Sequence, residues 1–207
     1  MSTKLSVLTP TIRPQYLKIT EKSLNNQSFT DFEWLVEEGD PNKGFSLPSD
    51  LNKLLKRAKG ERIVMLQDCI SIDSETLTKI NALPNDFYTF PVVKDGKEDW
   101  RTSRDGEVTP NMWEADFAAG PIQGFYDVGG YDEDFNNGWS WENVEIAWRI
   151  QAAGYKFYCD SSIIGNAIDH DAETDHPFRD KLENNDRRAE ATRKRAAHGD
   201  YKLHYVV

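Results

Sequence analysis

Hydrophobic and polar positions follow two alternating patterns over the first ninety residues. Short apolar runs typical of buried strands are separated by longer segments whose apolar residues recur at helical spacing. This alternation predicts an α/β fold with a parallel or mostly parallel sheet flanked by helices. The predicted strands are 5–9, 32–37, 62–66 and 87–93, and the predicted helices are 16–25, 47–58 and 74–83.

The clearest helix of the second half is predicted to run from Glu142 to Ala153 and to end at Gly154. An acid at a helix start is stabilised by the free N–H groups there, so a plain capped surface helix is one interpretation. The flanking Trp139 and Trp141 favour a sugar-binding loop instead. Positions 144, 147, 148 and 151 are expected to form one face, with Glu142, Glu145 and Arg149 on the neighbouring stripe.

The remaining segments complete a single predicted domain. The charged segment 94–109 is expected to be a hairpin or a mobile loop, and 155–159 a late strand. The basic and acidic residues of the helical tail indicate a solvated face rather than an anion site. The predicted parts are a nucleotide-binding half (1–93), a donor-sugar and acceptor half (94–177) and a C-terminal helical tail (178–207).

Composition narrows the function classes. Of the 207 residues, 38% are hydrophobic and 12% aromatic, which is enough for a folded core. The formal net charge of −10 argues against general nucleic-acid binding. Two cysteines, Cys69 and Cys159, do not make a disulfide framework, so free buried thiols are expected. No apolar run approaches a membrane span or a signal-peptide core, and we expect a cytoplasmic protein.

Polar residues follow three of the predicted strands, at 9–13, 37–40 and 67–73. Ligands of α/β sheets bind beyond the carboxyl ends of the strands, so these segments are expected to converge on one crevice. Asp68 suits a hard divalent cation that carries a diphosphate, although a structural turn Asp is an equal alternative. His170 lies beyond the last strand and would complete such a site, unless it is structural.

Several segments, in order, resemble family 2 type glycosyltransferases with the GT-A fold. Residues 6–13 resemble the first strand and nucleotide-binding loop of that family, and 23–40 resemble its "SL..Q…E.IVVDDGS" segment. Residues 52–64 are similar to the segment before its metal motif. The best match is 129–154, which resembles "GGFDE.F..GWE..D…R….G". Its Glu-Asn-x-Glu sequence is similar to that of polypeptide N-acetylgalactosaminyltransferases.

The resemblance implies transfer of a sugar from a nucleotide sugar, most simply a UDP-sugar, to an acceptor hydroxyl with Mn²⁺ or Mg²⁺. It implies roles in nucleotide binding, in holding donor sugar and acceptor, in metal binding and in the chemistry. The corresponding residues are Thr9, Pro10, Arg13, Glu38, Asn52 and Gln67 for the nucleotide; Ala119, Gly120, Pro121, Trp139 and Trp141 for the sugars; Asp68 and His170 for the metal; and Glu142 and Asn143 for the chemistry.

Two departures from the family leave questions open. The usual Asp-x-Asp is Gln67-Asp68-Cys69 here, which retains one carboxylate. Asn143 stands where many inverting members have a base, so either Glu142 is the base or the reaction retains configuration. A non-catalytic nucleotide-sugar or glycan-binding module is the alternative, and a nucleotidyltransferase ranks third because no glycine-rich phosphate loop is present. A glycan, a protein side chain and a modified nucleobase all remain candidate acceptors.

Overall fold

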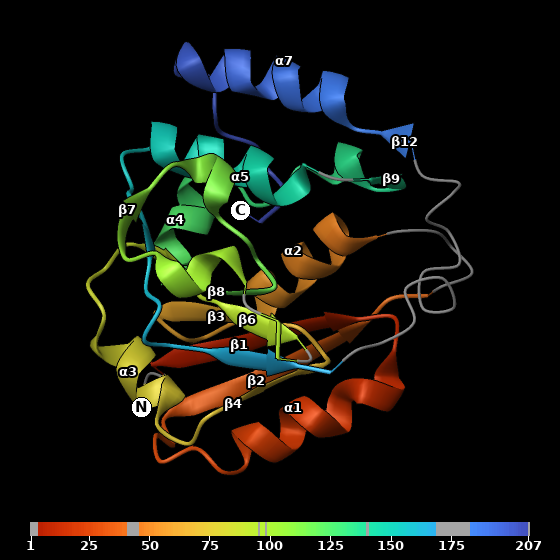
Figure 1. Ribbon diagram of the computed structural model, residues 1–207. Helices are drawn as coiled ribbons and strands as arrows, with labels where there is room; N and C mark the ends of the chain where they lie inside the picture. Colours follow the sequence, from red (N-terminus) through yellow and green to blue (C-terminus); the bar gives the residue numbers. More distant parts are fainter. Residues whose placement is uncertain are drawn as a thin grey trace.

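The computed structural model describes residues 4–40, 46–94, 96–97, 99–139, 141–168 and 183–206. A seven-stranded sheet forms the middle layer, with helices on both faces (Figure 1). In spatial order its strands are β2 (Phe32–Glu38), β1 (Leu5–Thr11), β3 (Arg62–Leu66), β8 (Phe117–Pro121), β5 (Phe87–Thr89), β10 (Phe157–Cys159) and β7 (Gly106–Val108).

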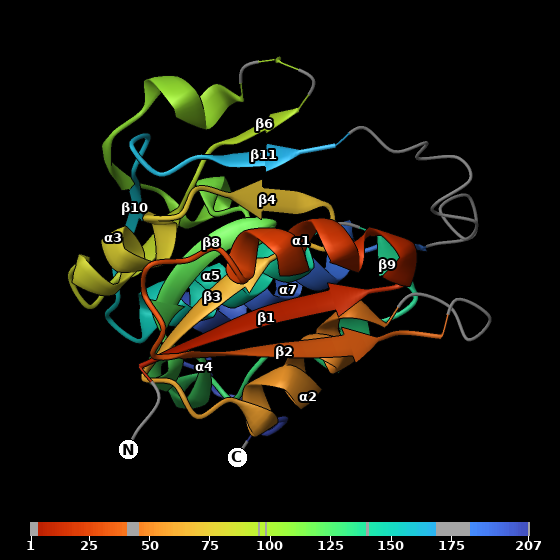
Figure 2. The same cartoon turned by 90° about the horizontal axis from the view of Figure 1, so that it is seen from below.

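Two smaller sheets complete the β-structure of the described residues. One has three strands and lies beside the main sheet, where Figure 2 shows its strands in a row. The other pairs two short segments ahead of α5 and α7. The three-stranded sheet consists of β4 (Ile70–Ile72), β11 (Gly165–Ala167) and β6 (Val92–Lys94), and the two-stranded sheet of β12 (Glu183–Asn184) and β9 (Gly138–Trp139).

Helices cover the main sheet unequally. Figures 1 and 2 show α1 and α3 on one face and α2, α4 and α5 on the other, with α7 packed over α5. Every described helix is too short or too polar to cross a bilayer. The α-helices are α1 (Leu17–Leu24), α2 (Leu47–Arg57), α3 (Thr76–Ala82), α4 (Ile122–Asp127), α5 (Glu142–Ala152) and α7 (Asp186–Ala197). Four 3₁₀ turns span Pro14–Tyr16, Trp100–Ser103, Pro110–Met112 and Glu133–Phe135.

The strand directions confirm the predicted α/β class. β1 pairs in parallel with β2 and β3, and β10 pairs in parallel with β5. β8 is antiparallel to both β3 and β5, so five strands run one way and β8 and β7 run the other. We call the edge at which β1, β2, β3, β5 and β10 end the carboxyl edge. Because β8 runs in the opposite direction, its first residue lies at that same edge.

Two predicted strand boundaries were wrong, and proline explains both. β1 continues through Pro10 to Thr11, because its pairing with β3 ends at Leu8 and the missing N–H of Pro10 faces no second neighbour. The predicted strand 87–93 is broken at Pro91. Its first part joins the main sheet as β5, and its second part becomes β6 of the small sheet.

The predicted elements did not include β8, the central antiparallel strand. Its sequence, Phe-Ala-Ala-Gly-Pro, is small and poor in β-branched residues. The small residues are required by packing, because a Cβ on Gly120 would lie 2.4 Å from the ring of Phe87. Every residue of β8 is buried between β3 and β5, so this strand holds the two parts of the sheet together.

The boundaries of α5 were predicted correctly, but its buried face was not. The helix ends at Ala152, and Gly154 follows with a φ of +101°. Ile146, Ala147 and Ile150 are buried in the core together with a charged pair from the neighbouring stripe. Of the expected face only position 147 is buried. The expectation failed because the buried charges, Glu145 and Arg149, neutralise each other.

Candidate functional site

The segment before β8 brings two acids to the end of β3 at the carboxyl edge. The backbone N–H of Gln67 donates to the carbonyl of Asp116, at 3.0 Å, so the residues before β8 lie against the end of β3. Glu114 precedes Asp116 within the same short segment. This juxtaposition extends the predicted crevice with two acids that the sequence analysis did not select.

Asp68 follows the end of β3, and both of its carboxylate oxygens are bound by other side chains of the protein. Its Oδ1 accepts from Arg13 Nη2 at 2.7 Å, and its Oδ2 accepts from Thr11 Oγ1 at 2.5 Å. The side chain is 1% exposed. Arg13, predicted to bind the nucleotide, and Asp68, predicted to bind the metal, are thus brought together as a buried ion pair across the ends of β1 and β3.

The other predicted nucleotide ligands occupy different environments. Thr9 is buried, and its hydroxyl donates to the carbonyl of Leu66 and accepts from Trp34 Nε1. Asn52 is buried too, and its amide bonds the backbone of Tyr131 in both directions. The structure therefore gives Thr9 and Asn52 internal partners, whereas Pro10 and Glu38 lie at the ends of β1 and β2 on the carboxyl edge.

The register of β8 places Ala119, Gly120 and Pro121 away from the carboxyl edge. Phe117 pairs with Leu66 at the end of β3, whereas Pro121 pairs with Arg62 at its beginning. The three residues therefore run from the middle of the strand toward the opposite edge of the sheet, and all of them are buried. The resemblance placed them in the donor-sugar pocket, but the residues that begin β8 at the carboxyl edge are Asp116 and its neighbours. The antiparallel direction of β8, invisible in the sequence, causes this difference.

Glu142 begins α5, and its carboxyl group differs from the other acids of this edge. Its Oε2 is buried, and no hydrogen-bond partner reaches it from the described residues. Burial raises the pKa of Glu142, and a hydrogen bond from its own backbone N–H offsets this only in part. A carboxylate with a free, desolvated oxygen is a good proton acceptor.

The start of α5 is anchored to the end of β3 by Tyr131. The Tyr131 hydroxyl group lies 3.5 Å from Asn143 Oδ1 and 3.4 Å from Met65 Sδ. Burial, and then the charge of Glu142, raises the pKa of this hydroxyl well above its ordinary value. Asn143 therefore accepts a hydrogen bond from a neutral phenol, and this contact holds the Glu142–Asn143 pair beside the strand that leads to Asp68.

Glu114 lies two residues before Asp116, and its backbone N–H and carbonyl both bond the hydroxyl group of Thr89. Desolvation, and then the charge of Asp116, raises the pKa of Glu114, and the charges of Asp99 and Glu142 act in the same direction. Arg101 opposes them. Burial and like charges together therefore make Glu114 harder to ionise than an exposed Glu.

Two tryptophans precede α5, and the structure describes Trp141 in full and the backbone of Trp139. Trp141 adopts a left-handed conformation, with a φ of +77°, at the position before the helix. Its indole Nε1 donates to Asp186 at the start of α7, and its ring lies 5.8 Å from that of Trp148. The backbone of Trp139 pairs with Asn184 in the two-stranded sheet. These contacts tie the loop before Glu142 to the C-terminal helix.

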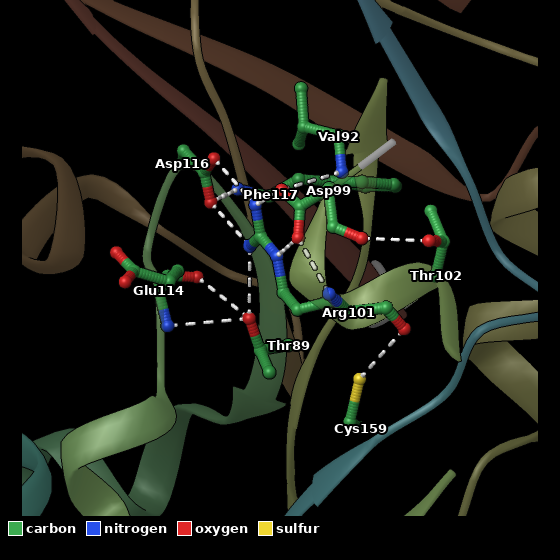
Figure 3. Close-up of polar contacts among 9 residues, drawn as sticks. All are labelled: Thr89, Val92, Asp99, Arg101, Thr102, Glu114, Asp116, Phe117 and Cys159. Atoms are coloured by element: carbon green, nitrogen blue, oxygen red, sulfur yellow. Dashed lines mark hydrogen bonds and ion pairs between the residues drawn. The ribbon is translucent and has the colours of Figure 1, made fainter. Parts of the chain in front are cut away.

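An arginine-centred cluster holds Asp116 in place (Figure 3). Arg101, whose side chain is 3% exposed, donates to both oxygens of Asp116 and to both oxygens of Asp99 at 2.6–2.9 Å. It also donates to Thr89 at the end of β5. Burial alone would raise the pKa of Asp99, but the hydrogen bonds from Arg101 lower it overall. The segment predicted to be a hairpin or mobile loop therefore contains a fixed, charged cluster.

The described residues do not assemble a cation site. No group of three His, Cys, Asp or Glu side chains with metal-binding geometry occurs among them. Both oxygens of Asp68 are occupied by Arg13 and Thr11, so this carboxylate does not fit a metal in the observed arrangement. His170 lies outside the described residues. The predicted Asp68–His170 pair stays a prediction, and both cysteines are buried and free as expected.

Sequence reasoning missed Glu114, Asp116 and the Asp99–Arg101 pair. A signal was present, because residues 113–116 read Trp-Glu-Ala-Asp directly before a small apolar run. Acids at the start of an antiparallel strand reach the same edge as acids at the ends of its parallel neighbours. Recognising β8 would therefore have placed these carboxylates beside Asp68.

Comparison with known proteins shows similarity in fold. No protein-family model matches the chain, and no curated protein matches its sequence. Solved structures do match. S. aureus TarS 1–349 in complex with UDP-GlcNAc gives a TM-score of 0.66 at 17% identity, covering 81% of this chain and 59% of that one. The Pyrobaculum calidifontis mannosyltransferase PcManGT, in complex with GDP-Man and Mn²⁺, gives 0.61 at 15% identity, covering 95% and 73%.

A third neighbour extends the same pattern. GalNAc-T7 with UDP, GalNAc and Mn²⁺ gives a TM-score of 0.59 at 13% identity, covering 81% of this chain and 44% of that chain. The neighbours are GT-A-type glycosyltransferases, and the chain has their mixed α/β fold. The chain spans about three fifths of the TarS fragment that it matches.

Proposed function

We propose that the chain transfers a sugar from a nucleotide-sugar donor to an acceptor hydroxyl, with Glu142 as the proton acceptor. The observation that carries the proposal is the buried Oε2 of Glu142, which has no partner among the described residues. The fold supports it, because the structural neighbours hold UDP, UDP-GlcNAc or GDP-Man. A UDP-sugar is the donor that the sequence resemblance favours.

The chemistry assigned to Glu142 is removal of a proton from the attacking hydroxyl. Burial raises its pKa, and a raised pKa strengthens the carboxylate as a base. Asn143 orients the pair through Tyr131 and does not itself accept a proton. Positioned bases of this kind contribute about 10²–10⁴-fold to rate.

A divalent cation would neutralise the departing diphosphate. GalNAc-T7 and PcManGT were both solved with Mn²⁺. Because Arg13 and Thr11 occupy Asp68, we assign no step of the reaction to a metal on this residue. Arg13 itself carries a positive charge at the carboxyl edge, where the diphosphate of a donor would lie in this fold.

The direct test measures nucleotide release from UDP-GlcNAc, UDP-glucose and GDP-mannose, with water as the acceptor. Wild-type protein is expected to release nucleotide from at least one donor. Glu142→Gln is expected to lose about 10²–10⁴-fold in this rate while binding the nucleotide as before. Glu190→Gln, an exposed acid on α7, is the matched control.

A binding module without turnover is the second candidate function, and the occupied Asp68 favours it. Nucleotide binding by calorimetry, combined with no release from any donor, would identify that case. Wild-type turnover in Glu142→Gln would instead overturn the role of Glu142 and leave the donor assignment intact.

A further inference from the structure

A cavity of about 350 Å³ lies at the end of β3, beside the three-stranded sheet. Its lining includes Gln67, which follows β3, and Asp116, which precedes β8. Both residues lie at the carboxyl edge of the main sheet, and ligands of α/β folds bind beyond this edge. The cavity therefore lies in the region where the donor of the proposed function is expected.

Two lysines line this cavity from one tight turn. An antiparallel bridge pairs Lys94 with Lys97, and the backbone N–H of Lys97 donates to the carbonyl of Lys94 at 2.8 Å. Residues directly opposite in such a pair project to the same face, with Cβ atoms about 4.5–5.5 Å apart. Like charges in this arrangement destabilise the fold, and an anion bound between them would remove the repulsion.

The carboxylates of the cavity are already neutralised in part by Arg101. Every oxygen of Asp99 and of Asp116 accepts a hydrogen bond from the Arg101 side chain, and Figure 3 shows both carboxylates turned toward it. Among the described charged groups of the cavity and this cluster, the three cations are Arg101, Lys94 and Lys97, against two carboxylates. One positive charge is left over, and the lysines carry it, so the lysine pair favours an anion.

The strand end at this cavity offers a poor set of metal ligands. Asp68 holds both oxygens against Arg13 and Thr11. The residues on either side of it, Gln67 and Cys69, line the cavity with an amide and a thiol, whereas a hard divalent cation prefers carboxylates. The two carboxylates of the cavity share a guanidinium, whose charge would repel a metal ion. The cavity therefore fits an anion bound directly by the protein better than an anion bound through a metal.

We propose that Lys94 and Lys97 hold the diphosphate of the nucleotide in this cavity, in the place of a divalent cation. The inference rests on the proposed function, which supplies the nucleotide-sugar donor. Lysine binds phosphate as a point charge, and it needs no metal to do so.

The lysines would act on the leaving group of the transfer step. The bond between the anomeric carbon and the diphosphate oxygen breaks, and its electron pair stays on that oxygen. The acceptor oxygen forms the new bond to the anomeric carbon, and its proton goes to Glu142. Lys94 and Lys97 stabilise the negative charge that develops on the diphosphate, and they exchange no proton.

Calorimetry with UDP and with GDP, in buffer that contains EDTA, tests the lysine pair. Wild-type protein is expected to bind at least one of them, and replacing EDTA by Mn²⁺ should change the affinity by less than about twofold. Lys97→Met is expected to weaken binding about tenfold or more, because a hydrogen bond between charged groups is lost. Lys22→Met is the matched control, since Lys22 is an exposed lysine in the last turn of α1 and does not line the cavity.

Two further variants keep the test decisive. Lys97 is exposed, so Lys97→Glu is expected to fold, and it should lose more affinity than Lys97→Met because the charge is reversed. Lys94→Met removes the opposite charge of the pair and should also weaken binding several-fold. Nucleotide binding that requires Mn²⁺ would overturn the proposal. Equal affinity of wild type and Lys97→Met in EDTA, or no nucleotide binding at all, would also overturn it.

Nucleotide release separates this inference from the proposed function. Release that depends on Glu142 and occurs only with Mn²⁺ would refute the lysine assignment and leave the transferase assignment intact. Nucleotide binding in EDTA that depends on Lys97, without release from any donor, would support the lysine assignment and refute transfer.

Discussion

The first two turns of α5 carry two glutamates in opposite situations. Glu145 is fully buried, and both its oxygens accept from Arg149 at 2.6–2.7 Å. Glu142 lies three residues earlier, and its buried Oε2 has no partner among the described residues. Burial raises the pKa of both carboxyl groups, but only at Glu145 does a guanidinium counteract it.

Under the proposed function, this difference separates a structural acid, Glu145, from the acid to which we assign the chemistry, Glu142. Arg149 also donates to the carbonyl of Val128, so the Glu145 pair joins α5 to the loop before Gly129. In the part of the chain that the structure describes, no partner reaches Oε2 of Glu142, and we propose that this oxygen accepts the proton. Asp68 resembles Glu145 in this respect, because its two oxygens are satisfied by Arg13 and Thr11. Partner arrangement, more than burial, therefore distinguishes the acids of this molecule.

The largest effect is expected on the reaction rate, when the Glu142 carboxylate is removed. Glu142→Gln should reduce nucleotide release from a donor sugar by about 10²–10⁴-fold, because the amide accepts no proton. Glu145→Gln should lower activity only in proportion to the folded fraction. Parallel measurement of rate and circular dichroism checks this, and equal specific rates for wild type and Glu142→Gln would contradict it.

Loss of the Arg149–Glu145 ion pair should lower the free energy of unfolding. Arg149→Met leaves the Glu145 carboxylate buried without its cation, and we expect a loss of about 3–5 kcal/mol in the free energy of unfolding. Urea denaturation measures it. The double variant Arg149→Met, Glu145→Leu should recover most of the loss, since both charges are then gone. Failure of the double variant to recover would show that the carbonyl bond to Val128, not the ion pair, dominates.

Asp68 tests whether an acid with satisfied oxygens also has a chemical role. Asp68→Asn should destabilise the fold by about 2 kcal/mol through the weakened contact with Arg13. If Asp68 is only structural, calorimetric binding of UDP with Mn²⁺ should otherwise match the wild type. Loss of metal-dependent binding in a folded variant would instead support the predicted cation site with His170.

The smallest effect is a pH dependence. Because the folded pKa of Glu142 is raised, the rate should increase with pH through a value above the ordinary 4.3 or so of a Glu. The raised pKa of Glu142 also contributes to the stability of the fold. This contribution is fully present below the ordinary pKa of a Glu, where the group is protonated. It is lost as the pH rises through the pKa that Glu142 has in the folded protein. Glu142→Gln should therefore melt slightly higher than wild type at pH 7 and nearly equally at pH 4, by calorimetry.

The local sequence pattern was sufficient for most of the fold. Apolar runs located β1, β2, β3 and β10, and helical spacing located α1, α2, α3 and α5 to within a few residues. It failed at β8, because Phe-Ala-Ala-Gly-Pro is selected for packing under Phe87 rather than for strand propensity. Because β8 was missed, Asp116, which lies before it at the carboxyl edge, was not selected as a candidate, whereas Ala119, Gly120 and Pro121 were.

The candidate site was predicted only in part, because several of its contacts join residues that are distant in sequence. Glu142 was found because a helix start and its neighbours are local in sequence. The partner of Asp68 lies 55 residues away, and Arg101 joins Asp116 from 15 residues away across an irregular segment. No periodic pattern encodes such pairs, because an irregular backbone places side chains through tertiary packing.

The sequence by itself determined most strands and helices of the first ninety residues, the acids that follow them and the helix start that carries Glu142. Only the tertiary structure decided which of those acids are neutralised and which are left with a free oxygen. The physical reason is that periodicity acts between near neighbours, whereas the ionisation of a carboxyl group depends on burial and on charges brought close by the fold. Arg13 finds Asp68, and Arg101 finds Asp116, in that way.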